Sequence, residues 1–104
     1  MIGYLDHADY RRLSARTKLL FEVLHEAYCN DRDPAAACRR LIAARRRMMR
    51  RLRGFQKRAA RTPGAREQLE RRVASLRYRN RCTRELARDY GWDLREPEAT
   101  AVAA

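Results

Sequence analysis

The chain has 104 residues, with 25 Lys and Arg against 13 Asp and Glu, and therefore a formal charge of +12. This length allows one domain at most, and only 18 residues are Leu, Ile, Val or Phe, which is too few for a large core. No stretch reaches the roughly 18 apolar residues of a membrane span, and the N-terminus lacks a secretory pattern. We therefore expect a soluble intracellular protein, located in the cytoplasm, the nucleoid or the mitochondrial matrix.

The first predicted element is a helix over about residues 8–29. Asp6 or Asp9 can cap its start by accepting hydrogen bonds from the free N–H groups of the first turn. Apolar residues then recur at spacings of three and four, which is typical of an amphipathic helix. The expected buried stripe consists of Tyr10, Leu13, Thr17, Leu20, Leu24 and Ala27, and it is widened by Leu19, Phe21, Val23 and Tyr28.

A second helix is predicted over about residues 34–60. Asp33 caps its start, and Pro34 follows at the first-turn position, where the missing N–H costs nothing. Gly54 weakens the helix by about 1 kcal/mol relative to Ala, so we expect a kink or an early stop there. Arg45 interrupts the expected stripe, which consists of Cys38, Leu41, Met48, Leu52, Phe55 and Ala59.

A third helix is predicted over about residues 64–90, after the break at 62–64, where proline cannot continue a helix interior. Gly91 is expected to take the left-handed conformation that ends a helix, and Trp92 to fold back on the last turn. Residues 94–104 are expected to be a tail. The expected stripe is polar in its middle and consists of Leu69, Val73, Leu76, Asn80, Thr83, Ala87 and Tyr90.

These elements predict an all-α protein with a single helical domain over residues 1–93. Three helices joined by short turns most simply form a small antiparallel bundle, and an extended helical hairpin is the alternative. The second and third helices supply mostly small residues, which bury little apolar area. A homodimer partner or docking on a larger assembly would complete such a core.

The positive charge is concentrated in one part of the chain. Residues 34–66 contain 12 basic residues and no acidic residue, and the rest of the chain has 13 of each. Like charges at i and i+4, such as Arg46 and Arg50, disfavour a helix by a few tenths of a kcal/mol per pair. An anionic partner would offset this repulsion. The alternative is a solvated helix neutralised by acidic residues of its neighbours, namely Glu22, Glu26, Glu67 and Glu70.

Nucleic acid, either DNA or RNA, is the first expected partner, because the planar guanidinium of Arg suits bidentate contacts to phosphate. Phosphate contacts position a protein without reading the base sequence, so we expect binding to be largely non-specific. Arg45 lies near the apolar seam and is expected to pair internally. The predicted binding residues are Arg39, Arg46, Arg47, Arg50, Arg53, Lys57, Arg58 and Arg61.

Support for base recognition is weaker. Most aromatic residues fall on apolar stripes, and only Tyr78, among Arg77, Arg79 and Arg81, lies away from them. Residues 83–91 resemble the first helix and turn of helix-turn-helix proteins. No recognition helix can follow before Pro97, so the resemblance implies no insertion into a major groove, and a capped helix end accounts for the segment equally well.

Nothing in the sequence indicates catalysis or a cofactor, and we expect a protein that is not an enzyme. His7 and His25 lack metal-binding spacing, and the cysteines, which are Cys29, Cys38 and Cys82, form neither a C-x-x-C pair nor a disulfide framework. They are expected to fill the core, although a position early in a helix among arginines would favour a Cys38 thiolate.

The second function considered is that of an adaptor, which would dock on an acidic surface of a larger protein complex. Basic adaptors of other kinds, such as phage or viral proteins that bind host factors, would leave no motif in the sequence. Tyr10-Arg11 with Leu13, followed by Arg50-Arg51-Leu52-Arg53 with Phe55, is similar to the pattern of mitochondrial LYR-motif proteins over about residues 10–76. Asp9 departs from that pattern, because the motif has Leu there, and the interval between the two blocks is long. The resemblance implies acyl-carrier-protein binding and service to respiratory or iron–sulfur machinery.

Overall fold

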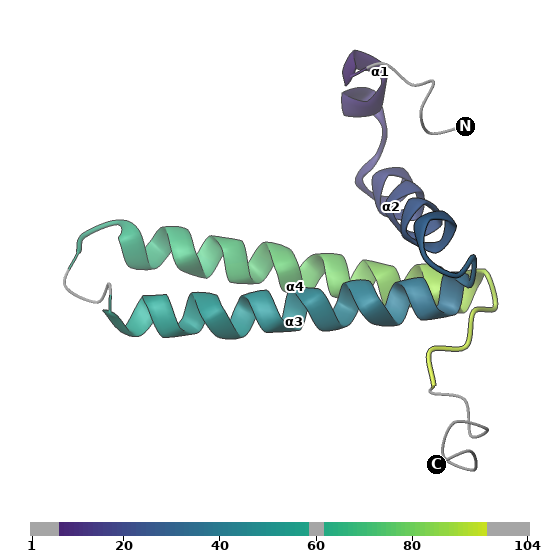
Figure 1. Cartoon of the computed structure of the whole chain (residues 1–104). Coiled ribbons are helices and arrows are strands. Elements are labelled where there is room, and N and C mark those ends of the chain that lie inside the picture. Colours follow the sequence, from purple (N-terminus) through teal and green to yellow (C-terminus); the bar gives the residue numbers. More distant parts are fainter. Residues whose placement is uncertain (1–6, 59–61, 96–104) are drawn as a thin grey trace, which may run out of the picture.

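The computed structural model describes residues 7–58 and 62–95, which are helical and contain no strand. The helices are α1 (His7–Arg12), α2 (Ala15–Cys29), α3 (Pro34–Arg58) and α4 (Ala65–Asp89). Helices α3 and α4 form a long antiparallel hairpin, and α2 packs on one end of it (Figure 1). The prediction of a small all-α bundle of three helices is thus confirmed. No helix in the described part of the chain is both long and apolar enough to cross a membrane.

The first predicted helix is divided into α1 and α2. Ser14 has an extended conformation, and its Oγ accepts a hydrogen bond of 3.2 Å from the Thr17 N–H. This is an N-cap, so Ser14 starts a new helix instead of continuing the old one. The prediction of one helix over residues 8–29 was therefore wrong at this point. Asp9 lies inside α1, and Asp6 lies outside the described residues.

The start of α3 is as predicted. Asp33 Oδ1 accepts a hydrogen bond of 3.0 Å from the Ala35 N–H, and the Asp33 carbonyl accepts one of 3.0 Å from Ala37. Pro34 occupies the first position of the helix. The preceding turn is tight, because Arg32 has a left-handed backbone with φ of 61°.

Helix α3 continues through Gly54 to Arg58, so the early stop considered at Gly54 does not occur. Helix α4 ends as predicted, with Gly91 in the left-handed region at φ of 72°. The Trp92 N–H donates to the Ala87 carbonyl at 2.7 Å and the Gly91 N–H to Arg88 at 3.2 Å, which is the Schellman pattern.

The core consists of two small clusters along the hairpin. The inner cluster lies where α2 covers the hairpin, and the outer cluster lies between α3 and α4 alone. This sparse core agrees with the shortage of large apolar residues in the sequence. The inner cluster contains Val23, Ala27, Ala37, Cys38 and Ala87, with Leu41, Trp92 and Leu94 packed against it. The outer cluster contains Met49, Leu52 and Val73, flanked by Leu69 and Leu76.

Between the clusters lies Arg45, which is only 7% exposed. Its guanidinium donates to Thr83 Oγ1 at 2.8 Å and to Asn80 Oδ1 at 3.2 Å, both on α4. It also donates to Glu22 of α2, with which it forms an ion pair. One side chain thus connects all three long helices, and it explains the polar middle of the α4 stripe.

The buried face of α3 is rotated from the predicted one. Ile42 and Met49 are buried, whereas Met48 is 42% and Phe55 51% exposed, contrary to prediction. The reason is that the predicted stripe treated Arg45 as an interruption, while the real face is centred on it.

The predictions for the other two helices agree better with the structure. In α2, Leu19, Val23 and Ala27 are buried, whereas Leu24 is exposed. In α4, Val73, Asn80, Thr83 and Ala87 are buried as predicted together with Leu86, and only the end of the stripe at Tyr90 is exposed.

We expect Arg45→Ala to lower the free energy of unfolding by about 2–3 kcal/mol, because it leaves Asn80 and Thr83 without their charged donor and Glu22 without its cation. Urea unfolding followed by circular dichroism measures this change. Arg46→Ala is the matched control, because Arg46 is exposed, and its effect should stay within about 0.5 kcal/mol. Equal effects of the two substitutions would contradict the role assigned to Arg45.

Candidate nucleic-acid interface

The arginines at the inner end of α3 are already engaged. Arg40 pairs with Glu26 at 3.1 Å and with Asp31 at 3.0 Å, and its hydrogen bonds lower the pKa of Asp31. Arg45 pairs with Glu22, as described above. Acidic residues of α2 and of the following turn therefore neutralise this end of the helix, as the solvated-helix alternative requires.

The part of the hairpin farther from α2 has much less compensation among the described residues. We call residues 46–58 and 62–81 the outer arm. It contains 13 basic and two acidic residues, a formal charge of +11. Of its two acidic residues, Glu70 is engaged with Arg66 at 3.4 Å and with Gln56 at 3.1 Å. Almost all of the net charge of the chain is therefore on this arm, most of which lies beyond α2.

Four cations of α3 lie on one side of this arm. They are Arg46, Arg50, Arg53 and Lys57, at spacings of four, three and four residues, which place them along one side of a helix. All four are exposed. Within the described part of the chain, none of them makes an ion pair or a side-chain hydrogen bond.

A second row on α4 repeats this spacing. It consists of Arg77, Arg81, Arg84 and Arg88, all exposed. Arg81 lies over the Tyr78 ring, with its guanidinium carbon 5.3 Å from the ring centroid. Arg88 Nε lies 3.9 Å from Asp89 Oδ1. The prediction of binding residues did not include this row, although the repeated spacing in the sequence was a signal for it.

The two rows lie on the same side of the hairpin. Asn80 Nδ2 donates to the Ile42 carbonyl and Gln56 Nε2 to Glu70, which fixes the antiparallel register. In this register Arg46 of α3 and Arg84 of α4 line the same shallow groove, which has a volume of about 290 Å³. Its other lining residues are Arg39, Ile42, Ala43 and Leu94. We call the two rows together the arginine face. The two rows overlap only in the middle of the hairpin. From there the α3 row extends toward the turn between α3 and α4, and the α4 row extends toward the end where α2 packs.

The other predicted residues do not belong to the two rows, although Arg39 borders the same groove as Arg46 and Arg84. The Arg39 guanidinium donates to the backbone carbonyls of Asp93 at 3.2 Å and Arg95 at 3.4 Å. Arg47 and Arg58 lie on another side of α3, and Arg58 covers the Phe55 ring with its guanidinium carbon at 5.2 Å. Arg61 lies outside the described residues.

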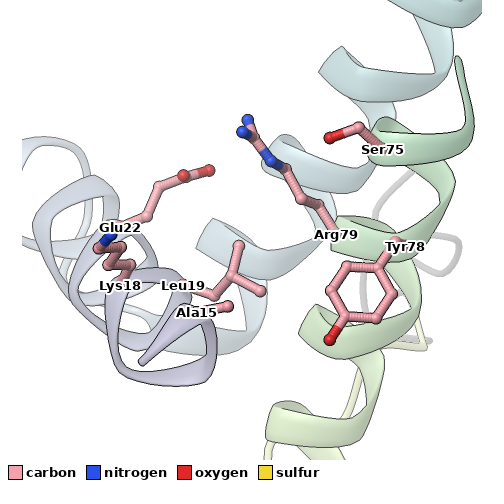
Figure 2. Close-up of a pocket in the computed structure, with 7 residues that line it drawn as sticks. All are labelled: Ala15, Lys18, Leu19, Glu22, Ser75, Tyr78 and Arg79. Atoms are coloured by element: carbon pink, nitrogen blue, oxygen red, sulfur yellow. The ribbon is translucent and has the colours of Figure 1, made fainter. Parts of the chain in front are cut away.

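A notch of about 490 Å³ separates the first half of α2 from the middle of α4. Figure 2 shows Tyr78 and Arg79 of α4 lying across this space from α2. Tyr78, the aromatic residue that the sequence singled out, is 49% exposed here. The remaining lining residues are Ala15, Lys18, Leu19, Glu22 and Ser75.

The cysteines and histidines give no sign of a metal site. The described residues contain no group of three or more His, Cys, Asp or Glu side chains placed to hold a metal ion. His25 and the exposed Cys29 are in contact, with Nε2 and Sγ 3.6 Å apart. Cys38 is fully buried, and burial raises the pKa of its thiol to about 11. The expectation that its position favours a thiolate was therefore wrong, because desolvation outweighs the neighbouring arginines.

Comparisons with known proteins find no match to this chain among family models, curated proteins or solved structures. Neither the helix-turn-helix resemblance of residues 83–91 nor the LYR-motif resemblance of residues 10–76 gains support from them.

We expect Cys29 to react with iodoacetamide at pH 8 at least tenfold faster than Cys38, because Cys29 is exposed while Cys38 is buried and protonated. Mass spectrometry of peptides from the alkylated protein measures both rates. Unfolding in urea should bring the two rates together. Fast modification of Cys38 in the folded protein would contradict its placement in the inner cluster.

Proposed function

We propose that this protein binds the phosphate backbone of nucleic acid, largely without sequence preference, through the arginine face. The observation that carries the proposal is the charge of +11 on the outer arm, together with the two rows of exposed cations on one side of the hairpin. Phosphate contacts supply most non-specific affinity for nucleic acids. No enzymatic step is part of the proposal.

Without a bound anion, the two rows of arginines destabilise the helices that carry them. Each row places like charges four residues apart, as in Arg46 with Arg50 and Arg77 with Arg81. Each such pair destabilises its helix by a few tenths of a kcal/mol. A sequence of phosphates along the face would turn this repulsion into attraction, and the effect would be strongest at low salt.

Arginine supports phosphate as the anion. Seven of the eight cations on the arginine face are Arg, whose planar fork binds phosphate oxygens in a bidentate way. The α3 row from Arg46 to Lys57 extends about 16 Å at 1.5 Å per residue. The same length of duplex DNA carries roughly ten phosphates, more than enough to meet the four cations of this row. DNA and RNA both offer this backbone.

The first test reverses the α3 row. The substitutions Arg46→Glu, Arg50→Glu and Arg53→Glu together should weaken binding to a 20-base-pair duplex at least 100-fold in 50 mM salt. Fluorescence anisotropy at several salt concentrations measures this. If all eight cations contact phosphates, the log–log salt slope of the unmodified protein is about −7, and the triple variant should lose about 3 from it.

The control for this test changes the net charge equally at another place. Arg11→Glu, Arg12→Glu and Arg32→Glu alter exposed residues on α1 and in the turn before α3. Affinity should fall less than fivefold, because these residues lie outside the arginine face. Equal losses in the two triple variants would mean that net charge alone, and not this face, binds the duplex.

A second test asks whether the α4 row takes part. Arg77→Glu, Arg81→Glu and Arg84→Glu together should weaken duplex binding about as much as reversal of the α3 row. Anisotropy with the same duplex gives this comparison directly. If binding were unchanged, the α3 row would act alone, as the sequence suggested, and the second row would have no part in the interface.

A further inference from the structure

Helix α3 has an exposed apolar stripe on the side where α2 packs. Leu41, Met48 and Phe55 are seven residues apart and so share one side of the helix. Leu41 packs against the inner cluster beneath α2, whereas Met48 is 42% and Phe55 51% exposed. Ala44 on the same side is exposed as well. The stripe formed by Ala44, Met48 and Phe55 therefore continues from Leu41 along α3 beyond the part that α2 covers.

Cations flank this stripe. Arg51 lies on α3 between Met48 and Phe55. The register that joins Arg45 to Asn80 places Arg79 of α4 across from Met48, and Arg72 two turns further toward the tip. Arg51, Arg72 and Arg79 are exposed and make no ion pair with any described residue.

The notch between α2 and α4 lies next to the stripe, because Arg79 borders both. Leu19 supplies an apolar wall of the notch, and Ser75 and Tyr78 supply hydroxyl groups (Figure 2). The surface thus offers apolar contacts at helical spacing, three free guanidinium groups and a notch at one end.

We propose that this surface binds an acidic amphipathic helix from another protein, an interaction beyond nucleic-acid binding and on a different side of the hairpin. Apolar residues at i, i+3, i+4 and i+7 of the partner pack on Met48 and Phe55, and its carboxylates meet Arg51, Arg72 and Arg79. The end of the partner helix lies in the notch beside Leu19. The partner occupies the position beside α2 that residues 7–58 and 62–95 leave uncovered.

Charge decides the kind of partner. An uncharged helix would cover Arg51, Arg72 and Arg79 without pairing them, which is unfavourable. A second copy of the chain would bring two arms of +11 together, and like charges across an interface cost several kcal/mol. Carboxylates on the partner remove both penalties.

Two synthetic peptides of 18 residues with identical Leu, Ala and Glu content test the proposal against the full chain. In one peptide Leu recurs at i, i+3, i+4 and i+7, and in the other the order is shuffled so that Leu is spread around the helix. Fluorescence anisotropy should show at least tenfold tighter binding of the amphipathic peptide. Equal affinities would overturn the proposal, because charge alone would then account for binding.

The variant Met48→Gln with Phe55→Gln should remove this preference while keeping the weaker binding of the shuffled peptide. Both residues are exposed, so the thermal unfolding curve should stay within a few degrees of the original. The triple variant Arg46→Glu, Arg50→Glu and Arg53→Glu is the matched control and should keep the preference. This control separates the apolar stripe from the arginine face, so that either proposal can fail without the other.

If the apolar stripe binds a second copy of the chain or a lipid surface instead, other measurements would show it. Sedimentation equilibrium that shows a dimer lost in the Met48→Gln, Phe55→Gln variant would assign the stripe to a second copy. Binding to phosphatidylglycerol–phosphatidylcholine vesicles that depends on the same two residues, without a peptide preference, would assign it to a lipid surface. Either result would overturn the proposal of an acidic helix.

Discussion

The structure depends on how one guanidinium group is accommodated inside a small protein. Arg45 is buried, and its donors must find acceptors, because a buried charge without partners is strongly unfavourable. Glu22 of α2 and Asn80 and Thr83 of α4 supply them. These bonds fix the rotation of α3 about its axis, because Arg45 must point inward. They also fix the register of α4 and the place where α2 crosses the hairpin.

Two surfaces follow from that rotation. With Arg45 inward, Ile42 and Met49 enter the core and Met48 and Phe55 face out. The arginine face then lies on one side of the hairpin and the exposed apolar stripe on the side of α2. The molecule therefore has one side suited to phosphates and another suited to an acidic helix. In the proposed functions, the chain would connect a nucleic acid to a protein.

The distribution of acidic residues separates the inner end of the hairpin from the outer arm. Glu22, Glu26 and Asp31 pair with arginines at the inner end, where α2 supplies a third layer and the inner cluster is buried. Beyond α2 only two helices remain, and the outer cluster of apolar residues is small. The larger buried cluster lies at the inner end of the hairpin, and most of the net charge lies on the outer arm.

Local signals in the sequence predicted helix ends well where one residue decides them. Asp33 with Pro34 starts α3, and Gly91 ends α4, because capping and a left-handed backbone involve only neighbouring residues. The early stop considered at Gly54 does not occur, because packing of α3 against α4 outweighs the helix penalty of glycine, which is about 1 kcal/mol. Ser14 was a capping residue inside an apolar pattern, and the continuous spacing of that pattern concealed the break.

The sequence by itself determined that the chain is helical, that its core is small and that its charge is concentrated in residues 34–66, because periodicity and composition are properties of the chain. Only the tertiary structure decided which side of α3 is buried. Arg45 shows the physical reason: a residue that looks like an interruption of an apolar stripe is stable inside when acceptors from distant segments surround it. The pairing of inner arginines with α2 and the second row of arginines on α4 likewise depend on contacts between helices, which local spacing does not record.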